Sequence, residues 1–249
     1  MKNSRTLLYA IATLLIASSA HAGWYEVRNY EGTIGNLPVH VSLQTYDYNN
    51  HDDAGRWRVD GSYYYDAHRI PIPLQGKRQP NGDMQLCEAT EPAAFGDSPA
   101  IPAASPAHPA PCPIALKISE SGAAGEWRDD KRALPIALHQ VGALNDTGLE
   151  PPAVVGAVQV PMWHHTKSHL LVGVYGTSKN CPLSMTALRL INLKNGQVDR
   201  DMKFDCGAGM VSTPIYANVY RANNPRHAIV LVKGGENGMG DDWDIAIEP

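Results

Sequence analysis

The chain has 249 residues, with 21 basic and 25 acidic side chains and a formal net charge of −4 at pH 7. This mildly acidic balance excludes an electrostatic footprint for nucleic acid or for an anionic membrane surface. The length suits one large all-β domain or two small ones, either able to bury a sizeable core, and we expect two.

The first residues predict a signal peptide. Two positive charges in Met1–Arg5 precede Leu7–Ala17, an apolar run of about the length of a signal-peptide core. The run ends at Ala20-His21-Ala22, whose small residues suit signal peptidase, so we expect cleavage of residues 1–22 after Ala22. No Cys follows the cut, and no later run approaches the roughly 20 apolar residues that span a bilayer. The expected product is therefore soluble and exported, either periplasmic or secreted.

The segment Tyr30–Glu88 predicts an antiparallel β meander. Short apolar or alternating runs recur there between Gly, Asn, Asp and Pro residues, which is typical of strands and not of helices. In the run that begins at Trp57, Tyr63 and Tyr65 share one face and Tyr64 lies on the other. The three tyrosines are therefore not expected to line a single surface.

The next run, Ile70–Leu74, contains Pro71 and Pro73. Because proline lacks a backbone donor, we expect this strand to be an edge strand or a bulged one. Asn81-Gly82-Asp83 then predicts a hairpin turn that tolerates positive φ. The strand after this turn is expected to end near Glu88.

Residues 91–113 are rich in proline and alanine, which favours an extended surface excursion within the first domain. Strand character resumes at Pro113–Ile118 and closes with Leu134–Leu138. We therefore predict a first β domain over residues 23–140.

Residues 141–153 are rich in Gly, Asn, Asp and Pro and predict a linker to a second β-rich domain over residues 154–249. Asn195-Gly196 is a strong hairpin signal in that domain. Met185–Leu190 is the one place where a short helix is an alternative. The candidate strands are 154–162, 170–175, 188–193, 202–206, 215–220, 228–232 and 243–247.

Six short motifs follow one another within residues 24–138: Tyr30-x-Gly32-x-Ile34-Gly35, Pro38-Val39, Gly61-x-Tyr63-Tyr64-Tyr65, Pro71-Ile72-x-Leu74-x-Gly76, Leu86-x-Glu88 and Gly125-x-Trp127. Their order resembles a recurring β domain of exported bacterial proteins that has no established activity. The resemblance implies a small, lipocalin-like meander or barrel. The predicted fold class is thus all-β, an N-terminal antiparallel meander or barrel followed by a second antiparallel β domain. The Pro/Ala-rich insertion and Cys87 depart from the pattern.

The four cysteines predict disulfide bonds, because an exported chain meets an oxidising compartment. Of three possible connectivities we favour the local pairs Cys87 with Cys112 and Cys181 with Cys206. Each would close a loop of roughly 25 residues and stabilise the fold by about 3 kcal/mol on the chain-entropy model. Zinc binding or thiol catalysis is disfavoured because no Cys-x-x-Cys occurs.

His164, His165 and His169 are the candidate metal ligands, since three imidazoles fall within six residues. The segment lacks the His-Glu-x-x-His pattern of helical zinc sites. On one strand, His165 and His169 would share a face and His164 would oppose them. A polar loop leading into a strand is the favoured interpretation.

The acidic tail contains Asp241, Asp242 and Asp244 beside several glycines. These carboxylates are candidate calcium ligands, although their spacing departs from the EF-hand loop. We favour an exposed acidic turn before a last strand. The same turn is also a candidate negative patch for a basic partner.

The aromatic candidates are Trp57, Tyr63 and Tyr65. We favour packing in the interior of the first domain. The alternative is a pocket, a contact surface or a sugar-stacking platform, because aromatic anchors contribute strongly to binding.

The sequence contains no complete catalytic motif, because Gly-x-Ser-x-Gly and Ser-x-x-Lys do not occur around Ser184 or Ser212. We therefore expect a non-enzymatic binding protein without a cofactor, most concretely a periplasmic inhibitor or immunity-type protein for a hydrolase or toxin. One alternative is a module that binds cell wall or oligosaccharide through Trp57, Tyr63 and Tyr65. Another is a metal-dependent hydrolase centred on the three histidines.

Overall fold

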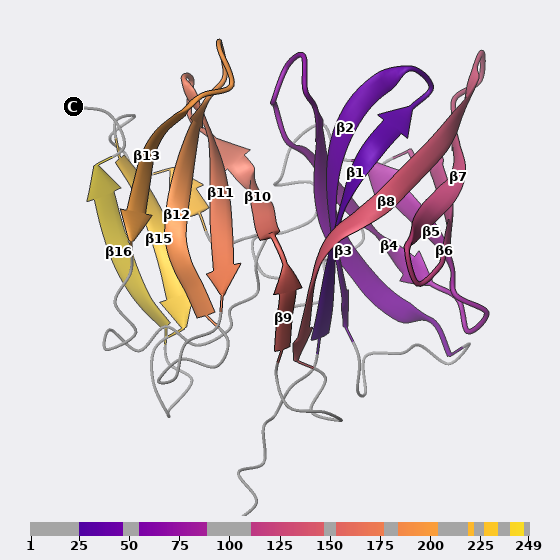
Figure 1. The fold of residues 1–249 in the computed structure, drawn as a ribbon, viewed down its shortest axis with the longest axis horizontal. Helices are drawn as coiled ribbons and strands as arrows, with labels where there is room; N and C mark the ends of the chain where they lie inside the picture. The colour runs from indigo at the N-terminus through magenta and orange to yellow at the C-terminus, as the bar shows by residue number, and fades with distance from the viewer. Residues whose placement is uncertain are drawn as a thin grey trace, which may run out of the picture.

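The computed structural model describes residues 25–46, 55–88, 111–146, 153–176, 184–203, 219–221, 227–233 and 240–246. These residues form sixteen β-strands, and none of them is helical (Figure 1). The predicted all-β class is confirmed. The predicted signal peptide lies outside the described residues and stays a prediction.

The N-terminal strands form an antiparallel meander that closes into an eight-stranded barrel. Each strand pairs with the next one along the chain, and β8 pairs back with β1 (Figure 1). A short ninth strand, β9 (Ala153–Gly156), pairs with β8 beyond the end of β7. The barrel strands are β1 (Tyr25–Ile34), β2 (Leu37–Tyr46), β3 (Trp57–Tyr65), β4 (Ile72–Arg78), β5 (Asp83–Glu88), β6 (Ile114–Ile118), β7 (Gly122–Arg128) and β8 (Ala133–Asp146).

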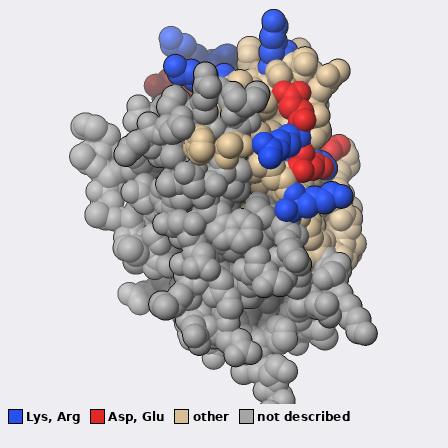
Figure 2. Space-filling model, turned by 90° about the vertical axis from the view of Figure 1, so that its left-hand side faces the viewer, with Lys and Arg blue, Asp and Glu red and all other residues tan. Residues whose placement is uncertain are grey.

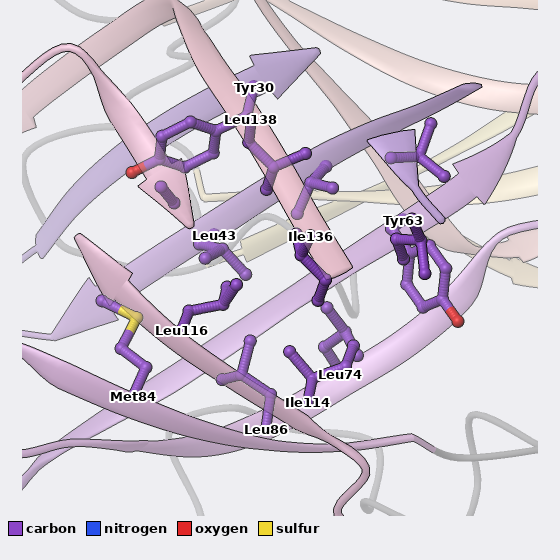
Figure 3. Close-up of a cluster of buried hydrophobic side chains, with 14 of the residues drawn as sticks. Tyr30, Leu43, Tyr63, Leu74, Met84, Leu86, Ile114, Leu116, Ile136 and Leu138 are labelled. Carbon is purple, nitrogen blue, oxygen red and sulfur yellow. The ribbon is translucent and has the colours of Figure 1, made fainter. Parts of the chain in front are cut away.

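Strand alternation decides which side chains fill the barrel. Val41 and Tyr63, which are cross-strand partners, both point inward and are buried. Tyr64 lies on the outer face, where its ring stacks on His40 with the centroids 4.9 Å apart. The predicted division of the tyrosines between two faces is confirmed. The packed interior, part of which is drawn in Figure 3, comprises Tyr30, Ile34, Val39, Val41, Leu43, Val59, Tyr63, Leu74, Met84, Leu86, Ile114, Leu116, Ala123, Ile136 and Leu138.

Gly76 lies where the backbones of β4 and β5 approach each other closely. A Cβ atom at this position would lie 2.0 Å from the carbonyl oxygen of Gln85 and 2.9 Å from Cα of Leu86. Both atoms belong to the backbone of the paired strand, so neither can move aside cheaply. Glycine is therefore required here by a close approach of two backbones.

The expectation that the proline-containing strand is an edge strand is wrong. β4 lies between β3 and β5 and pairs with both. Pro73 pairs with Ser62 of β3, but the pairing with β5 begins only at Leu74. Proline is tolerated at this position because the strand has a partner there on one side only.

The second half forms two further antiparallel sheets. The helix alternative for Met185–Leu190 is wrong, because these residues lie in β12 and pair with both neighbouring strands. The hairpin predicted at Asn195-Gly196 is confirmed, and Gly196 has φ +74°. One sheet contains β10 (Val158–His165), β11 (His169–Gly176), β12 (Ser184–Asn192) and β13 (Val198–Lys203), and the other contains β14 (Val219–Arg221), β15 (His227–Lys233) and β16 (Gly240–Ala246).

The predicted linker is strand over much of its length. Residues 141–146 continue β8, because β1 offers pairing partners as far as Tyr25, which lies opposite Asp146. The strand predicted over 154–162 is divided in two, since Gly156 ends β9 at φ +69° and β10 begins at Val158. Residues 147–152 lie outside the described part of the chain.

Side chains of the barrel wall and of β10 join the two halves. Ser62 Oγ donates to the carbonyl oxygen of Pro161 at 2.7 Å, and Trp163 Nε1 donates to the carbonyl oxygen of Gly61 at 2.7 Å. Asn29 Nδ2 also donates to the carbonyl oxygen of Gln159. These hydrogen bonds cap the edge of β10 that faces the barrel. Figure 1 shows where β10 lies relative to the barrel strands.

The second half exposes charges of both signs. In β13, Asp199, Arg200 and Asp201 are all exposed. Arg189 of the neighbouring strand holds Asp201 at 2.8 Å. Figure 2 shows acidic and basic side chains next to one another over the described part of this face. That part therefore offers mixed charge, which suits solubility more than the binding of a highly charged partner.

Cys87 and Cys112 form a disulfide bond, which confirms that predicted pair. The predicted pair Cys181 with Cys206 lies outside the described residues. Across the described ranges, no helix is long and apolar enough to cross a membrane.

Candidate functional site

One carboxylate joins three strands at the end of the barrel where β3, β5 and β7 terminate. Glu88 Oε1 accepts a hydrogen bond from Tyr63 Oη at 2.6 Å and another from Trp127 Nε1 at 2.8 Å. Each donor comes from a different strand, and Glu88 is the last residue of β5. We call this group the Glu88 triad, consisting of Tyr63, Glu88 and Trp127.

A backbone hydrogen bond and a disulfide bond hold the end of β5 in place at Glu88. Its backbone N–H donates to the carbonyl oxygen of Pro111 at 2.8 Å. The neighbouring residue, Cys87, is disulfide-bonded to Cys112. The carboxylate therefore meets the two donors from a fixed position.

Burial and the Glu88 carboxylate, in that order of importance, raise the pKa of Tyr63 well above its ordinary value. The phenol thus stays protonated at physiological pH and acts as a hydrogen-bond donor. The Tyr63 hydroxyl therefore holds its ring against Glu88 and does not act as a base.

An open apolar cavity of about 300 Å³ adjoins the triad. Trp127 contributes one wall and Tyr65, whose ring packs edge-on against Tyr63 at 5.5 Å, contributes another. Barrel mouths are common places for ligand sites, and this volume lies at the lower end of their usual range. We call it the Trp127 mouth; it is lined by Leu37, Pro38, Tyr65, Ala67, His68, Trp127, Arg132 and Leu134.

Exposed apolar side chains occur in the cavity lining and close to it in the sequence. Leu37, in the lining, is 47% exposed, and Ile70, two residues after the lining residue His68, is 49% exposed. Asp66 N–H donates to the carbonyl oxygen of Pro38 at 3.1 Å, so the turn after β3 is tied to β2. Exposed apolar surface at an apolar cavity is a feature of interaction sites.

Arg132 brings a cation to the rim without leaving it unpaired. Its guanidinium lies over the Trp127 ring, 5.5 Å from the centroid, and its Nη2 donates to Asp129 Oδ2 at 3.0 Å. The backbone N–H of Lys131 is the largest of several hydrogen bonds that lower the pKa of Asp129. This turn therefore presents a fixed and nearly neutral charge pair.

No protein-family model, curated protein or solved structure matches this chain. The similarity to a β domain of exported bacterial proteins stays a prediction. The geometry of the described residues is what bears on function.

The three aromatic candidates lie in three different settings. Tyr63 is 2% exposed and belongs to the core and the triad, whereas Tyr65 lines the Trp127 mouth. Trp57 begins β3, roughly 26 Å along the strand from Tyr65 at the rise of an extended chain. There Arg78 covers its ring at 4.7 Å. These residues do not form one platform; only Tyr65 lines the Trp127 mouth.

The histidine candidates are divided between two strands. His165 ends β10 and His169 begins β11, so the two histidines lie on different strands and the geometry of a single strand does not apply to them. His169 Nε2 lies 2.9 Å from Asp199 Oδ2, and its Nδ1 lies 2.9 Å from Ser168 Oγ. Hydrogen bonds from Asn192 and then from His169 lower the pKa of Asp199. This network ties the start of β11 and the end of β12 to β13.

No three metal-ligating side chains lie together anywhere in the described part of the chain. The side chain of His164 is not among the described ones, so a metal site on His164, His165 and His169 stays a prediction. Asp241, Asp242 and Asp244 lie in β16, paired with β15. The expectation of a turn at Asp241 and Asp242 is therefore wrong, whereas Asp244 lies in the last strand, where it was predicted. Their side chains also lie outside the description.

Sequence reasoning missed Glu88, Trp127 and Arg132 as parts of one site. Glu88 stands in the Leu-x-Glu motif, Trp127 in the Gly-x-Trp motif and Tyr63 in the tyrosine motif. The hydrogen bonds of the triad bring these three motifs together at one end of the barrel. Arg132 carried no signal of its own.

Proposed function

We propose that the protein is an exported, non-enzymatic binding protein of the inhibitor or immunity type. In this proposal the Trp127 mouth receives an apolar side chain of a hydrolase or toxin. The observation that carries it is the open apolar cavity whose lining includes the half-exposed side chain of Leu37.

A protein partner fits this surface better than an isolated small molecule. Binding hot spots are pockets that take one buried anchor, surrounded by contacts that exclude water. Leu37 lines the cavity and is still 47% exposed, so a protein surface would cover more of this side chain than a small ligand would. The rim would then supply the water-excluding contacts.

The site is also preorganised. The Trp127 ring is held by its hydrogen bond to Glu88, and Glu88 is held by its link to Pro111 and by the adjacent disulfide bond. A rigid wall loses little conformational entropy on binding, which favours affinity. The polar groups of the triad are hydrogen-bonded to one another, which holds the Trp127 ring in the orientation that a partner would meet.

The rim favours selectivity through charge as well as through shape. Arg132 and Asp129 form a fixed pair beside the cavity, so a partner must match both signs. Pairs of this kind contribute more to orientation and specificity than to affinity. A hydrolase surface with one apolar projection between polar loops is the complementary shape.

The test compares the wild-type protein with Leu37→Asp in capture experiments from periplasmic extract. Leu37 is half exposed, so the substitution is not expected to prevent folding. Val155→Asp is the matched control, because Val155 is 67% exposed on β9, away from the Trp127 mouth. We expect wild type and Val155→Asp to retain the same partner and Leu37→Asp to lose about tenfold or more in affinity.

A captured partner must also be affected by binding. The purified partner is titrated with the protein, and a hydrolase or toxin should lose activity as the complex forms. Retention of the partner by Leu37→Asp would overturn the assignment of the mouth. A partner whose activity is unchanged in the complex would overturn the inhibitor type of function.

A further inference from the structure

The opposite end of the barrel contains a second and larger cavity of about 520 Å³. It is lined by the other ends of the same strands, with Thr45 from β2 and Gln140 from β8. Leu43, Met84 and Ile118 supply apolar surface. The packed core separates this cavity from the Trp127 mouth, so the two are independent sites.

One buried polar atom of the cavity lining has no hydrogen-bond partner among the described groups. It is Gln140 Oε1. Tyr30, the cross-strand partner of Gln140 on β1, does not line the cavity, and its hydroxyl interacts with Arg28. Figure 3 shows the Tyr30 hydroxyl pointing toward the Met84 end of the core, whereas the Tyr63 hydroxyl points toward the other end. An unpaired buried polar atom costs about 1–3 kcal/mol, so a ligand that pairs with it gains affinity.

The charged residues of the lining already have partners. Arg28 Nε donates to Glu26, and the Arg78 guanidinium lies over the ring of Trp57. Arg28 and Arg78 are balanced in the lining by Glu26 and Glu120. An anion would have to compete with Glu26 for Arg28, and a cation would approach two guanidinium groups. The lining therefore favours a neutral ligand.

We propose that this second mouth binds a neutral sugar of one or two rings. Sugar hydroxyl groups donate and accept at once, which matches the mixture of Arg28, Glu26, Thr45 and Gln140. The C–H face of a sugar ring matches the apolar floor that contains Met84. A purely apolar ligand would instead leave Gln140 Oε1 unpaired.

The experiment is saturation-transfer NMR on the full chain with glucose, N-acetylglucosamine, cellobiose and maltose. Each sugar is tested up to about 10 mM, which detects dissociation constants into the millimolar range. Glucuronate and glucosamine are the charged comparisons. We expect at least one neutral sugar to bind and both charged ones to bind more weakly.

The site is assigned by variants with a matched control. Thr45→Val and Gln140→Leu should each weaken sugar binding about tenfold, as expected for the loss of one hydrogen bond. Leu37→Asp, at the opposite mouth, should leave it unchanged. Methyl signals of Met84 and Ile118 in the wild-type protein should shift on addition of the sugar, which tests the location even where a variant does not fold.

Binding by none of the neutral sugars would overturn the proposal. Stronger binding of a charged sugar would overturn the ligand class. Loss of binding in Leu37→Asp, or unshifted Met84 and Ile118 methyl signals in the sugar complex, would overturn the location. None of these results depends on whether a protein partner binds the Trp127 mouth.

Discussion

Trp127 donates its indole N–H to the Glu88 carboxylate at 2.8 Å, across 39 residues of sequence. The contact joins the end of β5 to β7 and fixes the ring that walls the apolar mouth. Because Tyr63 donates to the same oxygen, one carboxylate sets the positions of two aromatic rings.

Replacing Glu88 should therefore destabilise the barrel in a graded way. Glu88→Ala removes the acceptor from two donors and should lower the free energy of unfolding by about 2–3 kcal/mol. Glu88→Gln keeps one neutral acceptor and should lower it by only about 1 kcal/mol. Denaturant unfolding followed by tryptophan fluorescence measures both.

Glu126→Ala is the control for these variants. Glu126 is an exposed neighbour on β7 that pairs with Arg128, and exposed pairs contribute at most about 1 kcal/mol. Equal losses in Glu126→Ala and Glu88→Ala would contradict a special role for the triad.

The disulfide bond between Cys87 and Cys112 should stabilise both the fold and the Trp127 mouth. The two cysteines are 25 residues apart, and closing such a loop contributes roughly 3 kcal/mol on the chain-entropy model. Cys87→Ser with Cys112→Ser should lose about that amount in denaturant unfolding. Because Glu88 is adjacent, amide hydrogen exchange should also rise at residues 84–88.

Leu37→Asp with the disulfide intact is the comparison. It changes the mouth without opening the loop, so its hydrogen exchange at residues 84–88 should equal that of wild type. Unchanged exchange in the double cysteine variant would show that the disulfide bond does not hold Glu88 in place.

Local sequence patterns were sufficient to predict much of the barrel. Alternation placed Tyr63 inside and Tyr64 outside, and the turns at Gly82 and Gly196 were predicted because their positive φ suits glycine. The pairing of Cys87 with Cys112 was predicted from the expected export to an oxidising compartment and from the short segment between the two residues. Each of these features depends on residues that are close together in the sequence or on the compartment that the N-terminal residues predict.

Features that depend on distant pairing were not predictable in this way. Residues 141–146 have a linker composition, yet they form strand because β1 provides a free edge for them. Pro73 indicated an edge strand, yet β4 is internal, and proline is tolerated because pairing with β5 begins only at Leu74. The Glu88 contacts follow from barrel closure, which no local periodicity encodes.

Alkaline pH should destabilise the protein through its buried tyrosines. Burial raises the pKa of Tyr30 to about 12, with a smaller opposing effect of Arg28, and the pKa of Tyr63 is also raised. The folded state then holds its protons above pH 10 while the unfolded state loses them. Stability is therefore full below about pH 10 and falls above it by up to about 1.4 kcal/mol per pH unit for each such tyrosine.

Tyr30→Phe tests this expectation. The hydroxyl is buried and interacts with Arg28, so the variant should lie within about 1 kcal/mol of wild type at pH 7. Between pH 10 and about 12, its loss of stability per pH unit should be smaller by about 1.4 kcal/mol. Parallel wild-type and variant curves over that range would contradict the raised pKa.

Gly76→Ala should be among the most damaging small substitutions in the barrel. The added methyl would meet the backbone of β5 at 2.0 Å and 2.9 Å, so the unfolding free energy should fall by about 3 kcal/mol or more. Gly82→Ala is the control, because its Cβ would meet nothing within 4 Å. Only the strain of positive φ remains there, and we expect about 1 kcal/mol.

The hydrogen bonds between β10 and the barrel should couple the unfolding of the two halves. Trp163→Phe and Ser62→Ala each leave a buried carbonyl oxygen without its side-chain donor, at a cost of about 1–2 kcal/mol. Hydrogen exchange monitored by mass spectrometry should rise in peptides from β3 and from β10 together.

Ser119→Ala is the control, because Ser119 Oγ donates within its own turn to the carbonyl oxygen of Gly122 at 3.1 Å. Its effect should stay at that turn. Exchange that rises in β10 alone in Trp163→Phe would instead show that the barrel is stable without its second half.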